Sequence, residues 1–414
     1  MDKMKSALIT VSVISIVIIT LLYREIYLKT NGSSNMKSGT VTSSLKQEYQ
    51  RAFSNNDPPN CSLRRINDFM IRNNSFPGQG YWENIHSSDR HFVSSFCELL
   101  PPKRISKHLP DYMKTAKPKK IVIMGDSMGR NYANAFLSLL HKFAAYNCTT
   151  IKEEKKKETG FKPDKSYYIK GTNIKTQTLV ASTRTCRTCL SKYSQCMNKN
   201  TKHELDVEYI SMTMFNNASI VPNKTYCQNK LYQQEPICSV SNQMEFLFKI
   251  YLKERFPDVM ILFTTFAHAT SQGRTSSDMK RLLPSLYHLI DNMAPLNTTI
   301  LWVPTASADM SKLTVNRDKK YENGNNYEEQ IGHLNHALYD TLKEELLAGK
   351  LKTKMYGFLD LYAMTKHQDL KRVWSADHVH FKTPYYSTVM SYLVQTLHDN
   401  VVDIDSVQDT KSQI

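Results

Sequence analysis

The chain has 414 residues, 41% of them hydrophobic and 22% charged, so it can bury a large core, and we expect one large domain with appendages. Its 54 lysines and arginines outnumber 38 acidic residues, and the formal charge of +16 suggests anionic partners or surfaces. No basic block is interleaved with aromatic residues, so the composition argues against a nucleic-acid partner.

The first element along the chain is an uncharged apolar run of 17 residues, ALITVSVISIVIITLLY, at 7–23. It is longer than the apolar region of most signal peptides, and no small-x-small cleavage site follows it. We interpret it as an uncleaved transmembrane signal anchor, with a cleaved signal as the alternative. Residues 1–6 would form a cytoplasmic tail of a single-pass type II membrane protein. The rest would face the ER or Golgi lumen or the cell exterior.

Two further features favour a lumenal compartment. Seven Asn-x-Ser/Thr glycosylation acceptors lie beyond the apolar run, at Asn31, Asn60, Asn73, Asn147, Asn217, Asn223 and Asn297. The cysteines are even in number, and there are eight, Cys61, Cys97, Cys148, Cys186, Cys189, Cys196, Cys227 and Cys238. We expect disulfides whose pairing the sequence does not reveal, although the CRTC motif followed by a further cysteine is also compatible with zinc.

The polar segment 24–56 lacks apolar periodicity, and we interpret it as a flexible stem that precedes a lumenal domain at 57–400. The domain would begin with a lead-in at 57–115, which contains a GYW triplet and FCELLPP and is tied by a disulfide. Residues 148–240 contain six of the eight cysteines, and we expect an irregular, disulfide-braced insertion there. Residues 401–414 form a polar tail.

Apolar strands and amphipathic helices alternate along the domain. We expect strands at 120–124, 258–266, 298–305 and 356–362 and helices at 129–143, 243–256, 277–293, 326–347 and 383–399. This alternation predicts an α/β fold, a three-layer α/β/α sandwich with a mostly parallel sheet. Active sites of such sheets lie at the carboxyl ends of strands.

A serine stands at that position, where the apolar strand KIVIM passes through Gly125, Asp126 and Ser127 into a helix. A serine becomes a nucleophile when a histidine accepts its proton and a third group orients the histidine. The segment VWSADHVHF provides Asp377 and His380, whose spacing lets one short turn present both side chains together.

The blocks GDSMGR and DHVH resemble the GDSL/SGNH hydrolases, in particular the branch with Gly-Asp-Ser-x-x-Arg and a late Asp-x-x-His. That branch includes trichome-birefringence-like glycan O-acetyltransferases, PC-esterase proteins and sialic-acid O-acetyltransferase domains, and the lead-in GYW…FCEL is similar to the plant members. The resemblance implies a triad of Ser127, His380 and Asp377. It also implies an oxyanion donor from the Ser127 backbone N–H and support from Arg130.

The chain departs from this family in the remaining oxyanion donors, because no Gly-x-Asn follows the strand DVMILF. Thr265 or His268 can replace the missing donor, and Gly171 can supply another. We place Gly125 at the turn, and we expect Asp126 to cap the helix and brace the loop rather than act as a catalytic acid.

We expect three further histidines to be structural or exposed to solvent rather than functional. His378 is adjacent to the expected base but has the wrong spacing. His333 and His336 have the i, i+3 spacing of a metal pair, but we expect a solvated or partly packed pair. We therefore predict no metal and no cofactor.

These residues predict a serine-dependent O-acyl esterase or O-acyltransferase that acts on glycans or glycoproteins. Its partners would be the membrane, an acyl-bearing glycan or glycoprotein and, for a transferase, a lumenal acyl donor. The alternative is a catalytically inactive binding or structural protein that keeps the fold.

Overall fold

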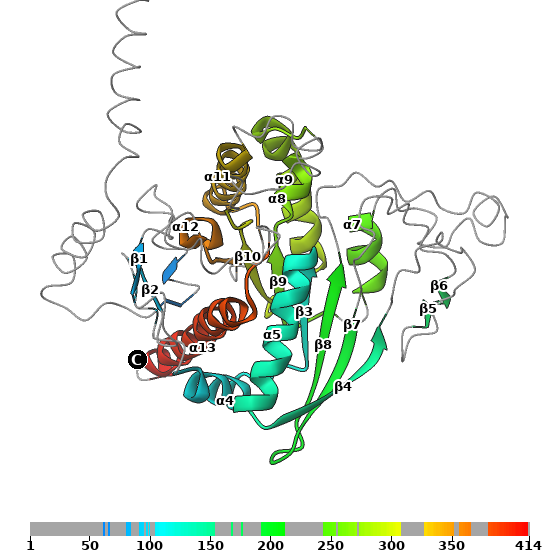
Figure 1. Ribbon diagram of the computed structural model, residues 1–414, viewed down its shortest axis with the longest axis vertical. Coiled ribbons are helices and arrows are strands. Elements are labelled where there is room, and N and C mark those ends of the chain that lie inside the picture. Colours follow the sequence, from blue (N-terminus) through cyan, green and yellow to red (C-terminus); the bar gives the residue numbers. More distant parts are fainter. Residues whose placement is uncertain are drawn as a thin grey trace, which may run out of the picture. The chain divides into compact units, whose positions relative to one another are not determined.

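A computed structural model (Figure 1) describes residues 61–62, 65–66, 80–83, 91–94, 97, 99, 104–153, 167–168, 175–176, 192–211, 243–253, 256–270, 273–307, 327–351, 356–365 and 380–412. The chain divides into two units, Met1–Ser54 and Asn55–Ile414, and every described residue belongs to the second.

The described strands are β1 (Gly80–Glu83), β2 (His91–Ser94), β3 (Lys120–Gly125), β4 (Tyr146–Glu153), β5 (Tyr167–Tyr168), β6 (Lys175–Thr176), β7 (Lys192–Asn198), β8 (Glu204–Ser211), β9 (Val259–Phe263), β10 (Thr299–Val303) and β11 (Tyr356–Phe358). The helices are α4 (Ile105–Thr115), α5 (Ser127–Phe143), α7 (Gln243–Phe246), the π-helix η3 (Leu247–Tyr251), α8 (Phe266–Thr270), α9 (Ser276–Met293), α11 (Tyr327–Leu347), α12 (Leu361–Thr365) and α13 (Thr383–Ser412).

The fold is α/β, with helices around a mixed sheet of seven strands in the order β11-β10-β9-β3-β8-β7-β4. The first five strands in this order run parallel to one another, whereas β7 pairs antiparallel with both β8 and β4. In Figure 1, β3, β8, β7 and β4 lie side by side in this order. The α/β fold expected from the alternation of strands and helices is therefore confirmed.

The central strands owe their position to uninterrupted apolar sequence. Every residue of β9 is buried, and in β3 and β10 only the first residue is partly exposed. Strands that are covered on both faces have this composition, and such strands form the centre of a parallel sheet.

The helices pack in two groups. One contains α4, α5 and α13, and α5 also contacts β3 and β8. The other contains α9 and α11, which contact each other, together with η3 against α9 and α8 against α11. In both α5 and α9 the apolar residues recur on one face and are buried.

The interpretation of residues 148–240 as an irregular insertion is wrong for its described parts. β4, β7 and β8 come from this stretch and complete one side of the main sheet. The sequence did not indicate these strands because they contain many polar residues. β7, for example, alternates between buried and more exposed positions and does not form an apolar run.

The helix boundaries differ from expectation in two places. The expected helix 243–256 is a short α-helix that continues as the π-helix η3 and turns before the next strand. The last helix does not end at residue 399. It continues to Ser412, through most of the segment set apart as a polar tail.

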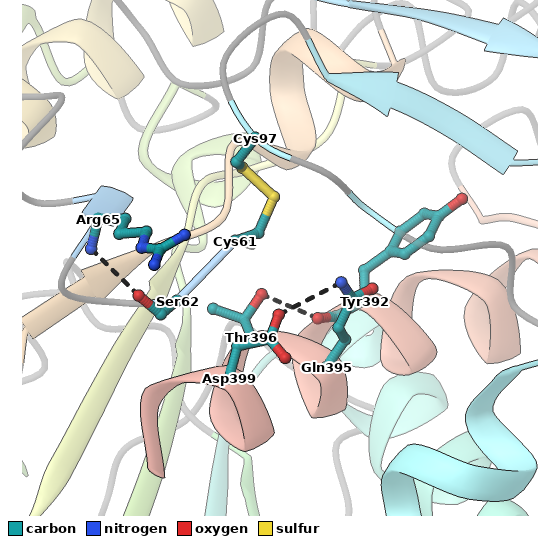
Figure 2. Close-up of a disulfide and its surroundings, with 8 residues drawn as sticks. All are labelled: Cys61, Ser62, Arg65, Cys97, Tyr392, Gln395, Thr396 and Asp399. Atoms are coloured by element: carbon teal, nitrogen blue, oxygen red, sulfur yellow. Dashed lines mark hydrogen bonds between the residues drawn. A yellow bond between two sulfur atoms is a disulfide. The ribbon is translucent and has the colours of Figure 1, made fainter. Parts of the chain in front are cut away.

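Two disulfides lie within the described residues. The first joins Cys61 to Cys97 in the lead-in and so confirms the expected tie there (Figure 2). The second joins Cys148 of β4 to Cys196 of β7, which face each other across the antiparallel pair. The other four cysteines of the sequence lie outside the described residues.

The described residues bear little on the expected membrane topology. The apolar run 7–23 and the stem 24–56 lie outside them, and no described helix has the length and apolarity needed to span a bilayer. Two glycosylation acceptors, Asn147 and Asn297, are described, and both are exposed, as attachment of a glycan requires. The remaining acceptors are outside the described residues.

Candidate active site

The centre of the candidate site is the turn between β3 and α5. Asp126 has extended backbone angles and is the N-cap of α5, and its Oδ1 accepts a hydrogen bond of 2.9 Å from the Met128 backbone N–H. The capping role expected for Asp126 is thus confirmed. Ser127 is the first residue of the helix, and because Asp126 caps it, the Ser127 hydroxyl is not needed for that purpose.

The structure brings Ser127 next to His380. His380 Nε2 lies 2.7 Å from Ser127 Oγ, although 253 residues separate them in the sequence. Both side chains are partly buried. A distance of 2.7 Å is that of a strong hydrogen bond, and it is the arrangement in which an imidazole accepts the proton of a serine hydroxyl.

Tyr386, on the first turn of α13, holds the histidine segment against α5. Its hydroxyl accepts hydrogen bonds of 3.0 Å from the Phe381 N–H and from Asn131 Nδ2, and it donates to Met128 Sδ at 3.3 Å. Both acceptor sites and the single donor of this hydroxyl are therefore used. The residue next to His380 is fixed to the helix that begins with Ser127.

Tyr209 of β8 holds the turn itself. Its hydroxyl lies 2.6 Å from the Asp126 carbonyl oxygen and 3.1 Å from that of Gly125, and it is buried. The Asp126 carbonyl also accepts the first hydrogen bond of the helix, 3.0 Å from the Arg130 N–H. Two donors therefore fix the peptide immediately before Ser127.

Gly125 is required at the turn because the neighbouring strand is too close for a side chain. A Cβ atom on Gly125 would lie 2.9 Å from Phe263 Cβ and 3.3 Å from Gly129 Cα. The Phe263 ring in turn stacks on Tyr132 of α5, with ring centroids 4.5 Å apart. Burial, followed by the nearby Tyr385, raises the pKa of the Tyr132 phenol well above its ordinary value, so it remains neutral.

Thr265 is one of the two residues expected to replace the missing oxyanion donor, and its side chain is described. It is 1% exposed, and its Oγ1 has no hydrogen-bond partner among the described residues. β3 and β9 are paired in parallel with Met124 opposite Leu262, so Ser127 and Thr265 each follow the carboxyl end of one of two neighbouring strands. A buried hydroxyl without a partner is uncommon in a folded protein and calls for an explanation.

The backbone around Thr265 is fixed by Thr305. The Thr305 hydroxyl donates to the Thr264 carbonyl at 2.7 Å and accepts from the Phe266 N–H at 2.9 Å. Asn335 in turn makes two hydrogen bonds to the Thr305 backbone, of 3.1 and 3.0 Å. Thr265 is thus held on both sides, while its own hydroxyl has no described partner.

The remaining predicted residues contribute less to the described geometry. Arg130 lies in the first turn of α5 and is partly exposed. His268 lies in α8, and its side chain is outside the described part of the chain. Asp377, His378 and Gly171 are also outside it. His333 and His336 are both exposed.

Sequence reasoning missed Tyr209, Tyr386 and Asn131. Each acts through a hydrogen bond to a distant segment, over 83 residues from Tyr209 to Asp126 and 255 from Asn131 to Tyr386. No local spacing indicates such a role. A tyrosine in a strand or helix is ordinarily interpreted as core packing.

The chain was compared with protein-family models, with curated proteins and with solved structures, and nothing matches it in any of the three.

Proposed function

We propose that the protein is a serine-dependent acyl-transfer enzyme of the SGNH hydrolase type. The observation that carries this proposal is the 2.7 Å contact between His380 Nε2 and Ser127 Oγ at the carboxyl end of a central parallel strand. The capped turn and the hydrogen bonds from Tyr209 and Tyr386 support it, because they hold both groups in place.

The proposed fold is a three-layer sandwich. Strand-helix-strand crossovers between parallel strands are right-handed. The chain passes from β3 through α5 to β4, beyond β8 and β7 in the sheet, and later from β9 and β10 through α9 and α11 in the opposite direction along the sheet. Right-handed crossovers in opposite directions assign the two helix groups to opposite faces, which supports a helical layer on each side.

In the proposed reaction, His380 is the general base. With the proton of its imidazole on Nδ1, Nε2 accepts the Ser127 proton while Oγ attacks the carbonyl carbon of an ester. The imidazolium then protonates the departing alcohol, which leaves an acyl-enzyme on Ser127. Asp377 is the proposed acceptor for the Nδ1 proton. Water or a sugar hydroxyl, deprotonated by the same histidine, completes the cycle.

The negative oxygen of the intermediate needs donors close to Ser127. We assign this task to the Ser127 backbone N–H, at the N-terminus of α5, and to the Thr265 hydroxyl. Thr265 Oγ1 has no partner among the described residues, and this supports the assignment, since a donor for the transition state is free to receive the oxyanion.

The proposed substrate is an O-acylated glycan or glycoprotein in the lumen of the secretory pathway. The disulfides and the exposed glycosylation acceptors support this compartment. A type II membrane anchor would hold the enzyme there. Whether the acyl group passes to water or to a sugar depends on the acceptor, and a transferase needs a lumenal acyl donor.

The test is labelling of the purified full-length protein with a fluorophosphonate, which reacts with activated serines, followed by turnover of an acetyl ester with and without a glycan acceptor. Wild-type protein should be labelled, and Ser127→Ala should not. His380→Ala should lower turnover by about 10³-fold or more, and the double variant should be little worse, because triad members act as a unit. His378→Ala is the matched control and should retain activity. Full labelling of Ser127→Ala contradicts the proposal.

A further inference from the structure

We propose that the protein binds one zinc ion between α4 and α13, through His108, His398 and Asp399. One potential ligand atom from each of these residues lies within 4.8 Å of the other two. It is the one group of three or more histidine, cysteine or acidic side chains among the described residues that has this geometry. Two imidazoles and a carboxylate are a ligand set that zinc accepts.

Two of the three donors already have the spacing of ligands on one ion. His398 Nδ1 lies 3.3 Å from Asp399 Oδ1, and two ligands of a tetrahedral zinc with bonds of about 2.0–2.2 Å are roughly 3.4 Å apart. The largest separation in the group, 4.8 Å, would have to close by about 1.5 Å to reach that spacing. The His108 and His398 rings are already neighbours, with centroids 5.2 Å apart, and we expect a side-chain rotation of His108 to supply this closure.

His108 is the observation that points to a ligand. Both of its ring nitrogens are buried, and neither has a hydrogen-bond partner among the described residues. A histidine in an ordinary structural role would use at least one nitrogen, because a buried polar atom without a partner is destabilising. An ion pair between His398 and Asp399 accounts for those two residues but leaves His108 unexplained.

The surroundings of the carboxylate suit a metal ligand. Gln395 Nε2 donates to Asp399 Oδ2 at 3.3 Å, and both residues are buried on α13 beside the Cys61–Cys97 disulfide (Figure 2). One carboxylate oxygen is therefore oriented by an amide, and the other faces His398. Hydrogen bonds of this kind fix metal ligands in known sites.

The charges around His108 come from both helices. Burial and the neighbouring His398 lower the pKa of His108, and Lys107 acts in the same direction. Asp399 and Asp111 act in the opposite direction. A neutral imidazole is the form that binds a metal. With two neutral imidazoles and one carboxylate as ligands, the zinc complex would carry a single net positive charge. The negative charge of Asp111 would therefore favour zinc binding.

Zinc would tie α4 to the last described helix, α13. His108 lies on α4, and the other two ligands lie on α13, which packs against α4. No sequence pattern indicated this site, because His108 and His398 are far apart along the chain and lie in no motif. The site does not involve Ser127 and is independent of the proposed reaction.

The experiment is zinc binding by the full-length protein, purified without a histidine tag, stripped with EDTA and treated with N-ethylmaleimide to block any free thiol. Titration against a chromophoric chelator should give one zinc per chain. His108→Gln and Asp399→Asn should each weaken binding by more than about 100-fold, and Gln395→Leu by about 10-fold. Cobalt bound in place of zinc should show no thiolate charge-transfer band.

The matched control is His288→Gln. His288 Nε2 lies 2.9 Å from Glu345 Oε2, so it is also a histidine paired with a carboxylate, but it belongs to no such group of three in the described structure. This variant should bind zinc like the wild type. If the wild type binds no zinc, or if His108→Gln binds it equally well, the proposal is wrong.

Melting temperatures give a second measurement that does not depend on the chelator. Without metal, His108→Leu should be as stable as the wild type or more stable, because it removes two buried nitrogens for which the described part of the chain offers no partner. With zinc, the wild type should melt at a higher temperature while the variant should not change. A wild-type melting temperature that zinc leaves unchanged would overturn the proposal.

Discussion

The hydroxyl of Tyr209 is the group whose removal best separates positioning of Ser127 from general stability. It lies 2.6 Å from the carbonyl oxygen of Asp126, the residue immediately before the proposed nucleophile. Tyr209→Phe keeps the buried ring and removes only this donor. The Asp126 carbonyl retains its bond from the Arg130 N–H, so it does not lose every partner.

The expected cost in stability is therefore modest. Loss of one buried hydrogen bond with a second donor still present should lower the free energy of unfolding by about 1 kcal/mol. For a large domain this corresponds to a melting temperature lower by about 2–4 °C. The loss of turnover should be larger than this loss of stability alone would cause, because the freed peptide can rotate and move Ser127 Oγ away from His380 Nε2. We expect turnover of an acetyl ester to fall about 10-fold, since misplacement by 1 Å can cost about 100-fold.

Tyr287→Phe provides a matched control. The Tyr287 hydroxyl is also buried and donates to a backbone carbonyl, that of Leu338, at 2.9 Å, between α9 and α11. It should lose as much stability as Tyr209→Phe but retain full turnover and a normal rate of labelling by a fluorophosphonate. If the two variants show the same loss of stability and the same turnover, Tyr209 does not position the nucleophile.

Three further changes test the site and the lead-in. Gly125→Ala should lower stability by about 1–3 kcal/mol and reduce turnover, because its Cβ would lie 2.9 Å from Phe263 Cβ, and a normal melting temperature would contradict this. Thr265→Val should reduce turnover about 100-fold without loss of stability, because its hydroxyl has no described partner, and unchanged turnover would remove it from the oxyanion site. Replacing Cys61 and Cys97 by serine should lower the free energy of unfolding by about 4 kcal/mol, from the sequence separation of 36, and chemical denaturation of both forms measures the difference.

The sequence was sufficient to predict the central strands of the sheet and two residues of the candidate site, Ser127 and His380. Uninterrupted apolar runs predicted β3, β9 and β10, because strands buried on both faces tolerate no polar residue there. Ser127 and His380 were found because each lies in a short motif at a strand or helix boundary. Their contact is seen only in the structure, because His380 lies just before α13 and 253 residues separate it from Ser127.

The sequence was insufficient wherever the decisive interaction is distant or half-exposed. The strands β7 and β8 pair antiparallel near one side of the sheet, where polar positions alternate with buried ones, and short segments of this kind resemble loops. That Thr265 Oγ1 and the His108 ring nitrogens lack partners within the described structure is a property of the folded chain. No residue spacing indicates it.

The last helix explains how these distant features are related. α13 begins directly after the His380 segment, and Tyr386 on its first turn fixes that segment to α5. Further along, the Tyr392 hydroxyl accepts a hydrogen bond of 2.6 Å from the Phe92 N–H of β2, and its pKa is raised by burial. Still further along lies Asp399.

Because a helix is stiff along its axis, the contacts of Tyr386 and Tyr392 fix the position of its first turn, and with it the position of the imidazole relative to Ser127. The proposed zinc at Asp399 would add a third such contact. The lead-in that contains the first disulfide is therefore part of what holds the proposed base in place. It packs on the same helix although it lies about 300 residues earlier in the chain, as the separation of 300 between Phe92 and Tyr392 illustrates. A change in the lead-in that shifts α13 along its axis should lower turnover through the distance between His380 and Ser127, even though the lead-in contributes no group to the reaction.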